Sequence, residues 1–115
     1  MSVDVGELFE TLFTAGANAF KEGWAQVKDF AHTEFKAIAA GLADIAEQVA
    51  MFKLGQGGYD LATGRMLTRM KLNQAEAAIA GATALTLVAV ASALNAVFDA
   101  VKAAFGQLAE LITPF

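Results

Sequence analysis

The sequence predicts an all-α fold, a long antiparallel hairpin of two helices of about 50 residues each that associates with copies of itself. The one proline stands at position 114, so no strong helix breaker interrupts residues 1–113. A single cluster of glycines, residues 55–58, divides two stretches with helical spacing of apolar residues. At 115 residues, the chain is expected to form one domain, residues 1–115.

The first helix is expected over about residues 4–54, because apolar and polar residues alternate there with the period of an amphipathic helix. Asp4 and Glu7 are spaced as a capping box at its start. A break near residues 16–18, with Asn18 as a new N-cap, is the alternative to one bent helix. The apolar spacing continues through that point and favours one bent helix. Its apolar face comprises Val5, Leu8, Leu12, Phe20, Trp24, Val27, Phe35, Ile38, Leu42, Ile45, Val49 and Phe52.

The glycine-rich turn is expected at residues 55–59 and the second helix at about residues 60–112. One face of this helix carries small residues at helical spacing, and an adjacent face carries large apolar ones. Small residues let a neighbouring helix approach closely, and large ones fill the spaces in it. We therefore expect an assembly interface made of Ala78, Ala82, Ala89, Val90, Ala93, Leu94, Ala96 and Ala100.

Folding the two arms back about the turn places acids opposite bases. Asp44 and Glu47 then face Arg69 and Arg65, and we expect these ion pairs to set the register of the hairpin. Exposed pairs of this kind contribute only about 0–1 kcal/mol each. The alternative is that the bases just before the apolar segment are the positive flank of a membrane helix.

No arrangement of residues points to catalysis, a cofactor, a metal ion or a small-molecule substrate. The chain has no cysteine, and its one histidine, His32, follows Asp29 on a polar helix face. The glycine-rich segment follows a helix and lacks the lysine of a phosphate-binding loop. The net charge of −4 and the absence of a basic stripe argue against nucleic-acid binding. We therefore expect a protein that is not an enzyme.

The expected function follows from the high hydropathy of the chain. The mean hydropathy is +0.49, and 57% of the residues are hydrophobic. The segment Ala77–Phe98 carries no charge, and a two-helix hairpin would leave part of it uncovered. We expect a structural subunit of a filament, a tube, or a virion- or secretion-type assembly that packs apolar helices laterally, with copies of itself as partners.

The alternative is a membrane-inserting protein of the pore-forming or delivery type, with Ala77–Phe98 as its membrane segment and lipid as its partner. A helical binding module is a third class of function, and no specific feature of the sequence points to it. The acidic N-terminal sequence lacks the basic start of a cleaved secretory signal. We therefore expect a cytoplasmic or virion-associated location, or export that needs no such signal.

Overall fold

The fold is seen in a computed structural model that describes residues 3–112. These residues form helices joined by short loops and contain no strand, which confirms the all-α prediction. The helices are α1 (Val5–Phe20), the 3₁₀ turn η1 (Lys21–Gly23), α2 (Trp24–Lys53), α3 (Leu61–Ala82), α4 (Leu87–Ala104) and the 3₁₀ turn η2 (Gly106–Leu108).

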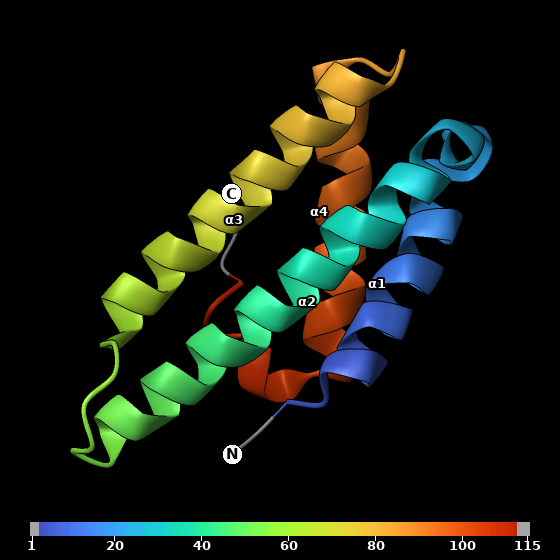
Figure 1. The fold of residues 1–115 in the computed structure, drawn as a ribbon. Helices are drawn as coiled ribbons and strands as arrows, with labels where there is room; N and C mark the ends of the chain where they lie inside the picture. Colours follow the sequence, from blue (N-terminus) through green and yellow to red (C-terminus); the bar gives the residue numbers. More distant parts are fainter. Residues whose placement is uncertain (1–2, 113–115) are drawn as a thin grey trace.

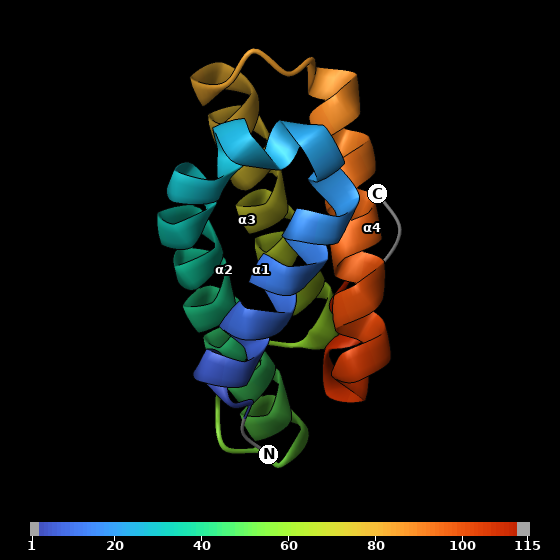
Figure 2. The same ribbon diagram turned by 90° about the vertical axis from the view of Figure 1, so that its right-hand side faces the viewer.

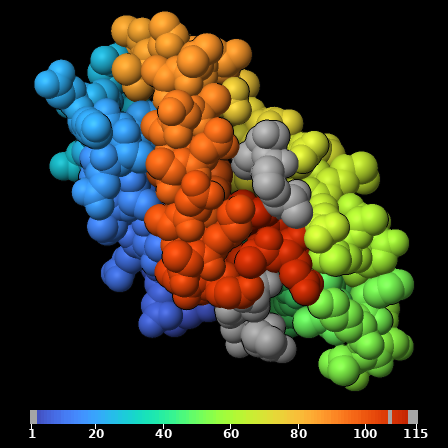
Figure 3. Space-filling model, turned by 180° about the vertical axis from the view of Figure 1, so that it is seen from behind, coloured from blue at the N-terminus to red at the C-terminus, as the bar shows by residue number. Residues whose placement is uncertain are grey.

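The four α-helices form an up-down-up-down bundle (Figures 1 and 2). Each helix packs against its neighbours along the chain, and α4 closes the ring by packing on α1. In the diagonal pairs, α1 with α3 and α2 with α4, no Cα atoms of the two helices lie within 8 Å of each other. From behind, α4 covers the centre of the molecule, with α1 on one side and α3 on the other (Figure 3).

The prediction of a two-helix hairpin is wrong, because each expected arm folds back on itself. Residues 5–53 stay helical, but the chain reverses direction at Lys21–Gly23. The expected helix 60–112 is broken at residues 83–86, and the last α-helix of the chain ends at Ala104. The bundle is 46 Å long, whereas a straight helix of about 50 residues would extend roughly 75 Å. Folding each arm in half gives the apolar faces a partner within the same chain.

The first bend depends on one unusual backbone conformation and one close approach. Lys21 has a φ of 52°, in the region that L-residues rarely adopt, and this turns the chain. The bend therefore falls after the alternative break expected at residues 16–18. Gly16 instead allows close packing, because a Cβ there would lie 2.7 Å from the Trp24 ring and 2.9 Å from the Phe35 ring. The missing side chain lets α1 lie close to the start of α2.

The second bend is held by side chains that satisfy backbone groups. Thr86 caps α4, since its Oγ1 accepts a hydrogen bond from the backbone N–H of Ala89 at 3.1 Å. The backbone N–H of Ala84 donates to Oε1 of Gln26 at 2.9 Å, which links this loop to α2. These two bonds satisfy backbone donors that the break in the helix leaves without a helical partner.

The antiparallel pairing expected about the glycine-rich turn is present between α2 and α3. Gly55, Gly57 and Gly58 have φ values of 72°, 85° and 87°, which favour glycine. A Cβ on Gly58 would collide with the carbonyl oxygen of Gln48. The tight turn therefore requires glycine at this position.

One chain closes its own hydrophobic core. All four helices contribute to it, and the C-terminal segment after α4 covers the end formed by α2 and α3. Association is therefore not needed to bury most of the large apolar residues, contrary to what a two-helix hairpin would require. Residues less than 4% exposed include Leu8, Leu12, Val27, Phe35, Leu42, Ile79, Val90, Leu94, Val97, Phe98, Val101, Leu108, Leu111 and Ile112.

Candidate functional site

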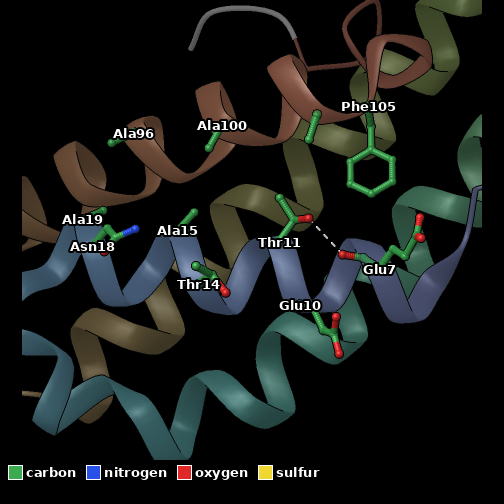
Figure 4. Close-up of a pocket in the computed structure, with 11 residues that line it drawn as sticks. Glu7, Glu10, Thr11, Thr14, Ala15, Asn18, Ala19, Ala96, Ala100 and Phe105 are labelled. Atoms are coloured by element: carbon green, nitrogen blue, oxygen red, sulfur yellow. Dashed lines mark hydrogen bonds between the residues drawn. The ribbon is translucent and has the colours of Figure 1, made fainter.

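A groove of about 760 Å³ lies between α1 and α4 (Figure 4). Alanines from both helices line it: Ala15 and Ala19 from α1, and Ala96, Ala100 and Ala104 from α4. Because alanine fills so little space, the two helices leave a long hollow above their contact. We call this hollow the α1/α4 groove.

Polar side chains border the α1/α4 groove on the α1 side. Glu7 and Glu10 lie at one end, and both are exposed. Thr11, which also lines the groove, donates from Oγ1 to the carbonyl oxygen of Glu7 at 2.9 Å. Phe105 lies at the same end, from the α4 side (Figure 4). Among the described residues that line this hollow, only the glutamates are charged, so this end of the groove is negative.

A second hollow of about 540 Å³ continues the groove toward the α3–α4 bend. It shares Asn18, Ala19 and Ala96 with the first and adds Ala89 and Lys21. The two hollows together extend along most of α4, on a face of small residues.

The predicted assembly interface is divided by the fold. Val90, Ala93 and Leu94 are 0%, 8% and 3% exposed and belong to the core of the molecule itself. Val90 and Leu94 therefore have almost no surface left for a contact outside the bundle, whereas Ala93 also lines the second hollow. The other predicted residues lie at the surface or partly so: Ala96 and Ala100 in the α1/α4 groove, Ala89 in its continuation, and Ala78 and Ala82 on α3.

The four residues of the predicted ion pairs are exposed side chains of α2 and α3. Pairing of Asp44 with Arg69, and of Glu47 with Arg65, stays a prediction. The contacts that the structure shows here involve the C-terminal segment. Nε of Arg65 donates to the carbonyl oxygen of Glu110 at 2.8 Å. The carboxylate of Glu110 also lies 3.0 Å from Nζ of Lys53, a contact that sequence reasoning missed because nothing in the spacing signals it.

A second unusual surface, with exposed methionines beside arginines, lies on α3. Met66 and Met70 are 58% and 51% exposed, although methionine is usually buried. Arg65 and Arg69 are exposed next to them in the sequence. We call these four residues the Met–Arg face. The first acid along α3 is Glu76, so this part of the helix is both apolar and positively charged.

His32 is exposed and lies against aromatic rings. Its ring centroid lies 5.3 Å from that of Phe9 and 6.1 Å from that of Phe13, both edge-on. Within residues 3–112, no group of three or more histidine, aspartate or glutamate side chains is placed to hold a metal ion. At the start of α3, hydrogen bonds from Thr63 lower the pKa of Asp60. Since Asp60 is the N-cap of α3, that shift reflects helix capping.

The apolar segment Ala77–Phe98 is not one helix in this structure. It comprises the end of α3, the loop at residues 83–86 and the first part of α4. Within the described part of the chain, one helix, Leu87–Ala104, is long and apolar enough to cross a membrane, with a mean hydropathy of 1.6. Core helices of bundles can meet the same criterion, and a third of this one is buried.

Comparisons with protein-family models, curated proteins and solved structures found no match.

Proposed function

We propose that the protein is a structural subunit that assembles with copies of itself through the α1/α4 groove. The observation that carries the proposal is the alanine lining of this groove, which two adjacent helices supply. Such a surface lets the side chains of another helix enter between the two helix axes. No polar side chain interrupts its α4 wall, which consists of alanines.

Surface apolarity supports the same proposal. The chain has a mean hydropathy of +0.49 even though its large apolar residues are mostly buried in one core. Several large apolar side chains stay exposed, among them Met66 at 58% and Met70 at 51%. Apolar surface beyond scattered single residues marks a contact site in soluble proteins.

The test is the size of the full-length protein as a function of concentration, by light scattering and negative-stain microscopy. The variant Ala96→Gln with Ala104→Gln fills the groove with polar side chains that favour helix. The matched control is Ala103→Gln, an exposed position of α4 outside the lining. We expect regular assemblies for the wild type and the control, and monomers for the groove variant. A wild-type protein that stays monomeric at every concentration would refute the proposal.

Membrane insertion is the second candidate, and the observation that favours it is α4. This helix meets the length and hydropathy of a span, and its first two residues, Leu87 and Val88, are exposed. Insertion would require α4 to leave the bundle, so that Val97 and Phe98 would face lipid instead of the core.

Flotation with phosphatidylcholine vesicles tests insertion. An inserting protein floats with the vesicles and has α4 protected from added protease. A protein that stays at the bottom of the gradient in both the wild-type form and the Ala96→Gln, Ala104→Gln form excludes this candidate.

A further inference from the structure

The α1/α4 groove defines what kind of surface can fill it. Alanines from both helices line it, so long side chains from outside can occupy the hollow of about 760 Å³. Its charged lining residues are Glu7 and Glu10, one helical turn apart. The complementary surface therefore carries long apolar side chains together with positive charge.

The Met–Arg face has this chemistry. Met66 and Met70 are one turn apart on α3 and more than half exposed. Methionine is unbranched and flexible, so it fills irregular hollows well. Arg65 and Arg69 are four residues apart and the two glutamates three, so each pair spans about one helical turn. Nε of Arg65 also donates to the carbonyl oxygen of Glu110 in its own chain.

We propose that the α1/α4 groove of one copy is filled by the Met–Arg face of a second copy. This inference rests on the proposed self-assembly and names the surface that enters the groove. The contact forms between molecules, because α1 and α3 stand at diagonal corners of the bundle, with no Cα atoms of the two helices within 8 Å of each other (Figure 2).

The contact joins two different surfaces, so each copy offers one groove and one Met–Arg face. Such a head-to-tail contact produces a ring where its rotation closes and an open filament where it does not. A symmetric contact of groove with groove fits less well, because two concave alanine surfaces would leave an unfilled space between them. Pairing the glutamates with arginines also orients the two copies, since opposite charges favour one docking direction.

The experiment separates the two surfaces by mutation. Met66→Gln with Met70→Gln alters the face, and Ala96→Gln with Ala104→Gln blocks the groove. Each double variant alone is expected to lose assembly and to sediment as a monomer. The control, Leu87→Gln with Val88→Gln, removes an apolar pair elsewhere that is on average more exposed, and it is expected to assemble as the wild type does. Circular dichroism checks that every variant keeps its helices.

Mixing the two monomeric variants is the decisive step. The face variant still has an intact groove, and the groove variant still has an intact face. We therefore expect one complex of two chains in a 1:1 ratio and no larger species. Failure of the mixture to form this complex would overturn the head-to-tail contact. Normal assembly of the Met66→Gln, Met70→Gln variant would also overturn it, while leaving self-assembly itself intact.

Discussion

Replacing Gly16 with alanine tests whether α1 folds back onto α2. In an exposed helix interior, alanine is more stable than glycine by about 1 kcal/mol. In this bundle the added Cβ would lie 2.7 Å from Cζ3 of Trp24 and 2.9 Å from Cε2 of Phe35, closer than carbon atoms pack. The helix propensity of alanine and the crowding of the rings therefore act in opposite directions.

The crowding is expected to dominate because the rings have little room to move. The ring of Trp24 also packs edge-on against Phe13, with centroids 4.9 Å apart, and against Phe35 at 6.3 Å. Overpacking a core costs typically about 1–3 kcal/mol. Subtracting the gain in propensity, we expect Gly16→Ala to lower the free energy of unfolding by about 1 kcal/mol. For a domain of this size, that corresponds to a fall in the melting temperature of about 4 °C.

The matched control is Gly81→Ala, because a Cβ at this exposed helical position meets no atom within 4 Å. We expect it to raise the free energy of unfolding by about 0.5–1 kcal/mol. Urea titrations followed by circular dichroism measure both changes, at one low protein concentration because association would add to the stability. If Gly16→Ala stabilises the protein as much as Gly81→Ala does, α1 does not pack on these rings and a straight first helix is correct.

Two further predictions concern helix caps. Thr86→Ala removes the hydrogen bond to the N–H of Ala89 and should lower the free energy of unfolding by about 1 kcal/mol in thermal melts, whereas Thr86→Ser should retain most of it. The lowered pKa of Asp60 means that its charged form contributes stability at neutral pH, which is lost as the pH falls from its ordinary pKa of 3.8 through the lower folded-state value. Asp60→Asn still accepts from Thr63 but does not titrate, so acid unfolding curves should show a smaller loss for this variant; equal losses would contradict the assignment.

The sequence was sufficient to predict the class of the fold, because helical periodicity depends on local spacing. It was also sufficient for the glycine-rich turn, where three residues require positive φ. It did not place the first bend. Gly16 and Gly23 both weaken a helix, but Gly16 serves close packing, and the reversal falls on Lys21, a residue type with no preference for that backbone conformation.

The sequence contains a signal for the second bend, but the signal is ambiguous. Thr86 is a good N-cap residue, but within an uncharged segment it also fits a stripe of small residues. The same ambiguity affected the candidate site. Spacing alone could not tell that Ala93 faces the core whereas Ala96 faces solvent, because that depends on which helix α4 packs against. The contribution of α1 was missed, although Ala15 and Ala19 are spaced one turn apart in the sequence.

The distribution of small and long side chains links the fold to the proposed assembly. Alanines on α1 and α4 let these helices approach each other, and the same alanines leave the groove on the outer side of their contact. Met66 and Met70 stand on α3, where the bundle does not bury them. Neither the groove nor the two exposed methionines is needed to close the core of a single chain. Because the hollow and the long side chains lie on different helices of one chain, they can meet only between copies, which favours a head-to-tail contact over a symmetric one.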